Sequence, residues 1–306
     1  VRLLGATPTC EQYSIDYATY VLFAAPFMAA NFVMNQCLRS EGSATLSMIG
    51  MGFGGILNVV LDPVFIFGLG LGTSGAAIAT VISQFLSAVL VLWYLRRRCE
   101  LRLTVHRPRD FTTVARNIIS LGTAGFIMAV TNAIVTLSCN SVLSRFGGDV
   151  AVGAMTVLTS INQLITMPLS GICQGGQPLI SYNYGAKKLD RVKEAFFCQF
   201  GVCVAYTTVF WLLLMAFPGV FAGIFTNDLA LVDYTAWALR IFLALGFSVG
   251  FQISCQQAFM ALGQAKISLL MALLRKVFLL IPMIFILPNF FADKAFAVFL
   301  AEPVSD

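Results

Sequence analysis

Charged residues are scarce in this chain of 306 residues: they make up 11% of it, whereas hydrophobic residues make up 58%. A soluble globular domain usually carries about 25% charged residues, because it needs polar side chains to cover its surface. The mean hydropathy of +0.86 points the same way. The composition excludes most soluble enzymes, disordered chains and nucleic-acid-binding proteins, and it predicts an all-α polytopic membrane protein.

Residues that build catalytic and metal sites are also rare. The single histidine, His106, lies in a basic segment, and none of the eight cysteines forms a C-x-x-C pair. We therefore expect neither a metal centre nor a disulfide framework, with cysteine acting as a small hydrophobic residue. The sequence has no P-loop and no Ser/His or paired-Asp constellation, so we expect neither an ATPase nor an intramembrane enzyme.

Apolar stretches of about 20 residues can cross a bilayer as helices, and the chain contains eight of them. They cover residues 17–38, 44–67, 76–95, 117–144, 150–184, 195–227, 234–262 and 267–288. A ninth stretch begins near residue 295. Because the chain begins with Val1 and ends within this stretch, we expect it to be a piece of a longer protein.

The basic residues predict the orientation of these spans. If the loop at 96–116 is cytoplasmic, the loops on its side hold 13 Lys and Arg residues and the opposite side holds 3. Such a bias is typical of the positive-inside rule. We expect a multi-pass protein of the plasma (inner) membrane, in contact with lipid and not with nucleic acid, and monomeric.

A faint internal repeat accompanies this topology. When the first span and its following turn are shifted by 221 residues, they align without gaps onto the seventh span, with six identities that include Gly42 with Gly263. Five spans lie between the copies, so both enter the membrane from the same side. This indicates two parallel halves, and the long segment 96–116 lies where they would join.

Asp62 is the only charged residue in the second span. A carboxylate inside a span usually faces a cavity or a partner. Asn58 precedes it by one helical turn, and Thr80 on the next span can add a hydroxyl. These oxygens suit a hard cation such as Na⁺, and the same carboxylate could carry a proton instead. Alternatively, Asp62 braces the glycine-rich turn at 68–75.

Polar uncharged side chains in the later spans are candidates for a substrate cavity, together with a flexible methionine. The candidates are Asn162, Gln163, Met167, Gln252 and Gln256. Ordinary hydrogen bonding between helices would also account for the amides.

Other features of the spans predict packing and solvation. For the basic pair Arg275 and Lys276, we expect the side chains to extend toward the inner interface in preference to lining a cavity. The G-x-x-x-G pairs at 50–54 and 171–175 predict close helix contacts.

Three stretches resemble the MATE (multidrug and toxic compound extrusion) family. They are residues 35–42 (NQCLRSEG), residues 58–68 (NVVLDPVFIFG) followed by 75–84 (GAAIATVISQ), and residues 175–188 (GGQPLISYNYGAKK). The resemblance implies a two-lobe fold of twelve helices, of which this chain supplies helices four to eleven and the start of twelve. Residues 1–95 would then be the last three helices of the N-terminal lobe, 96–116 a cytoplasmic linker, and 117–306 the C-terminal lobe.

The same resemblance implies a function. It is secondary active export of amphipathic drugs or toxic organic compounds in exchange for H⁺ or Na⁺, with no other cofactor. Asn58, Asp62 and Thr80 match the positions of the family's N-lobe cation site, which also uses an Asp on a first helix that this chain does not contain. The alternatives are a non-functional truncated fragment and a flippase for a lipid-linked precursor, which would favour a strongly cationic cavity.

Overall fold

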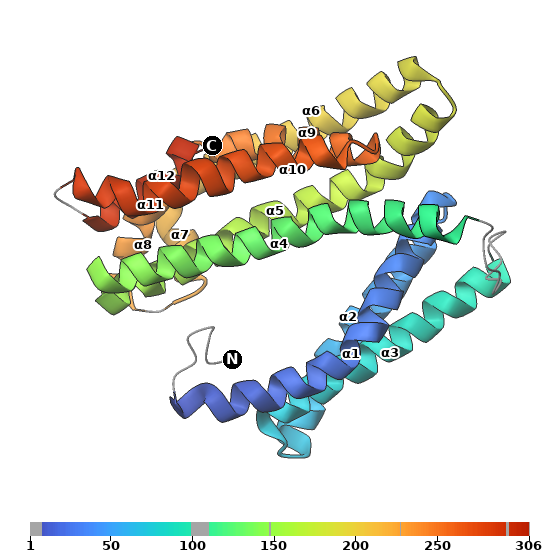
Figure 1. The fold of residues 1–306 in the computed structure, drawn as a ribbon. Coiled ribbons are helices and arrows are strands. Elements are labelled where there is room, and N and C mark those ends of the chain that lie inside the picture. The colour runs from blue at the N-terminus through green and yellow to red at the C-terminus, as the bar shows by residue number, and fades with distance from the viewer. Residues whose placement is uncertain (1–7, 99–109, 147, 227, 292–293, 306) are drawn as a thin grey trace. The chain divides into compact units, whose positions relative to one another are not determined.

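The computed structural model describes residues 8–98, 110–146, 148–226, 228–291 and 294–305, and the regular elements in these ranges are all helices (Figure 1). The chain divides into two compact units, Val1–Arg107 and Pro108–Asp306. Both ends of the predicted linker are helical, since α3 continues to Arg98 and α4 begins at Phe111. Most of its middle, residues 99–109, lies outside the described residues.

The first unit is built from three long helices. They are α1 (Pro8–Ser40), α2 (Ala44–Pro63) with the wide π-helical turn η2 (Val64–Gly68), and α3 (Gly72–Arg98). Both α1 and α2 pack against α3. The predicted contact at Gly50 and Gly54 is confirmed: a Cβ added at Gly54 would lie 2.9 Å from Ser87 Cβ, and one at Gly50 would collide with Val91. The absence of side chains at these two positions lets α2 and α3 approach closely.

The second unit contains long helices, several of them interrupted. Its elements are α4 (Phe111–Phe146), α5 (Gly148–Gly185), α6 (Leu189–Ala216), α7 (Pro218–Gly223), α8 (Leu229–Phe242), η3 (Gly246–Ser248), α9 (Val249–Ala261), α10 (Ala265–Leu273), the π-helical η4 (Leu274–Leu280), α11 (Ile281–Ile286), η5 (Leu287–Asn289) and α12 (Lys294–Ser305). Its core is an apolar cluster contributed by α4, α5, α8 and α12, around Leu143, Leu158, Leu239 and Phe299.

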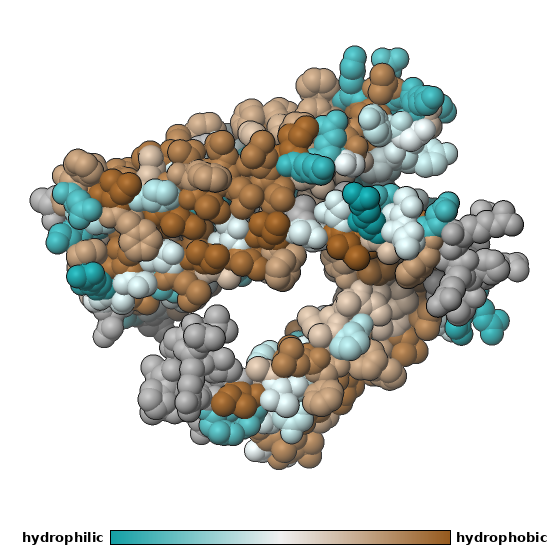
Figure 2. All heavy atoms as spheres, in the orientation of Figure 1, coloured by the Kyte–Doolittle hydropathy of each residue, from teal (hydrophilic) through white to brown (hydrophobic). Residues whose placement is uncertain are grey.

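The polytopic membrane architecture is confirmed. Within the described ranges, seven helices are long and apolar enough to cross a membrane, and an eighth span results if the bent pair α8 and η3–α9 is counted as one. Figure 2 shows hydrophobic side chains over much of the helices, with hydrophilic ones gathered near helix ends, as at the turn between α5 and α6. The side of the membrane on which each loop lies stays a prediction.

Two of the expected continuous spans are broken. The span expected at 195–227 divides into α6 and α7, because Pro218 occupies the first turn of α7 and cannot donate a backbone hydrogen bond to α6. The span expected at 234–262 bends by 58° between Phe242 and Gly246. A side chain of α6 satisfies one carbonyl at this bend, since Trp211 Nε1 donates to Leu243 O at 2.8 Å.

The second G-x-x-x-G pair does not behave as predicted. A Cβ added at Gly171 or Gly175 would meet nothing within 4 Å among the described residues, so the expected close contact there is wrong. The neighbouring Gly176 makes the approach instead, with Gln199 of α6 against it. Because successive residues of a helix differ by about 100° in direction, the spacing alone did not identify which glycine faces α6.

The two turns aligned by the internal repeat have the same geometry. Gly42 after α1 and Gly263 after α9 both have positive φ, +84° and +75°. In each turn the next residue donates its N–H to a carbonyl five positions earlier, Ser43 to Leu38 at 2.9 Å and Gln264 to Phe259 at 2.8 Å. This is the Schellman ending of a helix, and it supports the correspondence between α1 and α9.

Candidate functional site

The predicted cation ligands come together in the first unit. Asn58 and Asp62 lie one turn apart on α2, and Asn58 Nδ2 donates to Asp62 Oδ1 at 3.1 Å. The same Nδ2 lies 3.4 Å from Thr80 Oγ1 on α3. Thr80 Oγ1 itself donates to Ala76 O at 3.0 Å, so the lone pairs of its oxygen remain directed toward Asn58. The three side chains are half-buried.

The chemistry of this cluster fits a small hard cation. The Asn58 amide nitrogen donates to a carboxylate and to a hydroxyl, and a cation would need both of those oxygens. A rotation of the amide by 180° would present Oδ1 in place of Nδ2, which makes three oxygen ligands. Hard cations generally take about six or more oxygen ligands, so waters or further residues must complete the shell.

The alternative that Asp62 braces the glycine-rich turn finds no contact to support it. Within the described part of the chain, the hydrogen bond recorded for Asp62 comes from Asn58 and not from the backbone of residues 68–75. That turn is closed by its own backbone, through Leu69 N to Val64 O at 3.0 Å and Leu71 N to Phe65 O at 3.2 Å. Asp62 is therefore available for another role.

The second unit contains a cavity of about 490 Å³. Side chains of α4, α5, α8, α9, α10, η4 and α12 surround it. Its polar lining residues are Thr131, Asn132, Thr136, Thr159, Asn162, Gln163, Thr166, Ser170, Gln252, Gln256, Gln257, Arg275, Lys276 and Glu302. Its apolar lining includes Met128, Val135, Met155, Phe242 and Val249. This volume lies in the range of small-molecule sites, about 300–1,000 Å³.

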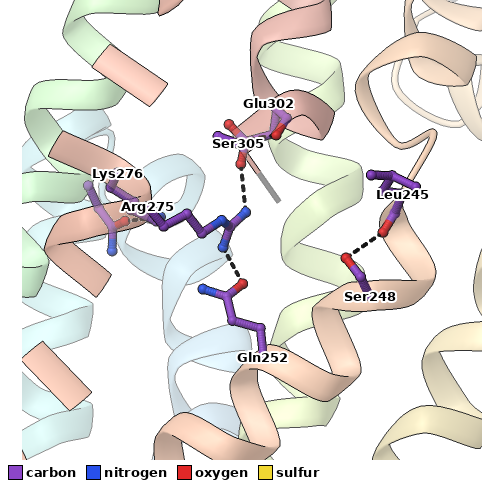
Figure 3. Close-up of polar contacts among 8 residues, drawn as sticks. Leu245, Ser248, Gln252, Arg275, Lys276, Glu302 and Ser305 are labelled. Carbon is purple, nitrogen blue, oxygen red and sulfur yellow. Dashed lines mark hydrogen bonds and ion pairs between the residues drawn. The ribbon is translucent and has the colours of Figure 1, made fainter. Parts of the chain in front are cut away.

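Charged side chains meet in this cavity. Arg275 of η4 lies between α9 and α12, where its guanidinium donates to Gln252 Oε1 and pairs with Glu302 Oε1 at 3.2 Å (Figure 3). The Arg275 and Glu302 side chains are only 15% and 17% exposed. The next residue, Lys276, donates through Nζ to Asn132 Oδ1 of α4.

Four of the five predicted cavity residues line this space, namely Asn162, Gln163, Gln252 and Gln256. Met167 does not, and its side chain is 68% exposed. It lies four residues beyond Gln163, a rotation of about 40°, which carries it past the edge of the lining face of α5. The role of the four lining residues in binding substrate stays a prediction.

The expectation for the basic pair is wrong. Arg275 and Lys276 line the cavity instead of extending to the interface, because Glu302, Gln252 and Asn132 provide partners inside the unit. Sequence reasoning also missed Glu302, the third charge of the site. The sequence did contain a signal for it: Glu302 is the only acid in the mostly apolar helix Lys294–Ser305, and acids within apolar helices often face a cavity or a partner.

Comparison with known proteins identifies the family. The family model described as MatE matches residues 124–286, more than half of the chain. The chain belongs to the MatE family. This confirms the resemblance seen in the motifs.

Relatives of this MatE chain include curated export proteins. It is 27% identical over 291 residues to multidrug export protein MepA of Staphylococcus saprophyticus, covering 95% of this chain and 64% of the relative. It is 26% identical over 293 residues to MepA of Staphylococcus aureus, covering 94% of this chain and 64% of the relative. The chain thus spans about 64% of the length of these relatives.

Solved structures confirm the MatE fold. The crystal structure of MATE in complex with MaL6 superposes with a TM-score of 0.90 at 23% sequence identity, covering 98% of this chain and 68% of that one. A MOP superfamily transporter from Pyrococcus furiosus also gives a TM-score of 0.90, at 22% identity, covering 99% of this chain and 68% of that one.

Proposed function

We propose that the full-length protein exports amphipathic organic compounds from the cell, in exchange for a cation that enters. The observation that carries this proposal is the cavity of about 490 Å³ in the second unit of a MatE chain, with amide and hydroxyl groups on its lining beside Met128, Met155 and Phe242. A mixed lining of this kind accepts ligands of varied shape through adaptable packing and a few hydrogen bonds. The MepA relatives, named as multidrug export proteins, support it.

We place the coupling cation at the first unit. Asp62 would supply the charge, Asn58 and Thr80 neutral oxygens, and the cation would be H⁺ or Na⁺. The driving force is sufficient: one proton crossing about 100 mV releases about 2.3 kcal/mol, and a pH gradient of one unit adds about 1.4 kcal/mol. Together they support a concentration ratio of roughly 500-fold for the exported compound.

Charge distinguishes this proposal from the flippase alternative. A flippase for a lipid-linked precursor would favour a strongly cationic cavity. The lining side chains here carry two positive charges, Arg275 and Lys276, and one negative charge, Glu302, which pairs with Arg275. With one positive charge in excess, the lining is not strongly cationic, which favours export over the flippase alternative.

Ethidium efflux from energised cells that express the full-length protein tests the proposal. Asp62→Asn keeps the shape of the side chain and one hydrogen-bonding oxygen but removes the charge that holds a cation. We expect uphill efflux to fall to the level of cells without the protein, while the amount of protein in the membrane stays near normal. A protonophore or sodium removal, applied to the unchanged protein, identifies the coupling ion.

The matched control is Asp190→Asn, which removes an exposed carboxylate in the first turn of α6 that does not line the second-unit cavity. It should leave efflux intact. Full efflux by Asp62→Asn would contradict the assignment of the cation site, whereas absence of ethidium efflux by the unchanged protein would contradict export of amphipathic cations.

A further inference from the structure

The charges of the second-unit cavity do not cancel. Its lining includes the guanidinium of Arg275, the ammonium of Lys276 and the carboxylate of Glu302, a formal sum of +1. The two basic groups come from neighbouring positions of η4, and the acid comes from α12, so the excess is created where these elements meet.

Arg275 does not carry this excess, because its charge is compensated. Glu302 Oε1 lies 3.2 Å from Arg275 Nη2, and both side chains are largely buried. Gln252 accepts a second hydrogen bond from the guanidinium (Figure 3). A buried arginine held by a carboxylate and an amide gains little from a further anion.

Lys276 carries the uncompensated charge. Its ammonium donates to the neutral amide oxygen of Asn132, and the described part of the chain records no ion pair for it. An ammonium has three N–H donors, so donors remain after the bond to Asn132. Away from bulk water, an unpaired positive charge attracts an anion more strongly than it would on a surface.

The rest of the lining suits the remainder of such a ligand. Gln163, Gln256 and Thr131 offer neutral hydrogen-bonding groups, and Val135, Met155 and Phe242 offer apolar contact. A site with one cationic group beside an apolar wall matches an organic molecule that has an acidic group on an apolar body.

We propose that this cavity binds amphipathic organic anions, with the ammonium of Lys276 as the counter-charge to their carboxylate or sulfonate. The Arg275–Glu302 pair sets the polarity, because Glu302 removes one of the two positive charges. The inference that such anions are exported rests on the proposed function, whereas their binding does not.

Two fluorescent probes that differ in one charged group test this proposal. Anilinonaphthalene sulfonate and N-phenylnaphthylamine share a ring system, and only the first carries a sulfonate. Each is titrated onto the full-length protein in lipid nanodiscs, with the signal from empty discs subtracted. We expect Lys276→Met to weaken binding of the sulfonate about tenfold, as for loss of one charge-assisted bond, and to leave the neutral probe nearly unaffected. Lys276→Arg should retain most of the sulfonate affinity.

Lys266→Met is the matched control, since it removes an exposed lysine of α10 that does not line the cavity. It should leave both probes unaffected. Glu302→Gln keeps a hydrogen-bonding side chain and raises the formal charge of the cavity by one, so the sulfonate should bind more tightly, provided that the thermal stability of the variant is near normal.

Equal affinities of Lys276→Met and the unchanged protein for the sulfonate would overturn the proposal. So would loss of ethidium binding in Glu302→Gln with unchanged sulfonate binding, because the cavity would then select cations. The titrations need no ion gradient, so their failure is distinguishable from a failure of ethidium efflux.

Discussion

The two units place amides at corresponding positions and use them in opposite ways. Asn31 and Asn35 of α1 correspond to Gln252 and Gln256 of α9 through the shift of 221 residues. In the first unit the amides are buried and tie helices together: Asn31 Nδ2 donates to Ser87 Oγ at 2.9 Å, and Asn35 Nδ2 donates to Asn31 Oδ1 at 2.7 Å. In the second unit they line the cavity.

The helix after each pair of amides explains why they differ: α2 follows α1 in the first unit, and α10 with η4 follows α9 in the second unit. The counterpart of Arg275 is Gly54, where α2 and α3 are so close that even a Cβ would press on Ser87. One half thus carries an acid on a tightly packed helix, and the other half carries basic residues beside a cavity. A repeated framework can therefore separate a cation site from a ligand site by exchanging a few residues, which is the division that we propose.

The largest effect is expected from removing Arg275, which occupies the position that Gly54 has in the first unit. Arg275→Met leaves the Glu302 carboxylate buried without its partner, and breaking a buried pair in this way costs about 3–5 kcal/mol. We expect a large fall in the thermal unfolding temperature of the purified full-length protein. Arg275→Met combined with Glu302→Met should recover most of the loss, and failure to recover would show that the pair is not the source.

A smaller effect should distinguish the corresponding amides. Asn31→Ala removes bonds to Gln84, Ser87 and Asn35 inside the first unit, and we expect a loss of about 1–2 kcal/mol in the free energy of unfolding. Gln256→Ala removes one bond to the weak acceptor Met128 Sδ, 3.4 Å away. It should cost less than about 0.5 kcal/mol. Equal losses of stability in the two variants would contradict the conclusion that the first-unit amides hold helices together whereas the second-unit amides line a cavity.

The smallest change in stability is expected at the glycine turn that both halves share, at Gly42 and Gly263. Gly42→Ala and Gly263→Ala place a side chain at positive φ without a steric clash among the described residues. Each should destabilise the protein by about 1 kcal/mol, to a similar extent, because the cost comes from the backbone conformation. The converse change, Lys187→Gly, replaces a residue at φ 57° and should be slightly stabilising. Thermal unfolding of the three variants measures all of these effects.

Local patterns predicted the first-unit cluster and much of the fold. Asn58 and Asp62 are one turn apart, and that spacing alone puts them on one face of α2. Apolar length predicted the spans. The bend after Phe242 was harder to predict, because it is stabilised by Trp211 of α6, which is distant in sequence.

The charged part of the second site could not be predicted from local patterns. Arg275 and Lys276 lie in η4, where the π-helical turn changes the direction in which successive side chains point. Regular helical periodicity therefore does not give their face. The partner Glu302 comes from α12, and only the packed structure brings it to Arg275.

The π-helical turn η4 also has an evolutionary consequence. A π-helical turn closes its hydrogen bonds one residue further along the chain than the α-helix on either side, so it holds one residue more than regular winding would. Removing one residue from Leu274–Leu280 would restore regular α-helical winding and rotate the residues on one side by about 100° relative to the other. The basic pair and its surroundings would then lose their present alignment without any change in residue type. Deletion of one residue at this turn would therefore change the charge of the cavity, and a count of substitutions between two sequences would not register that change.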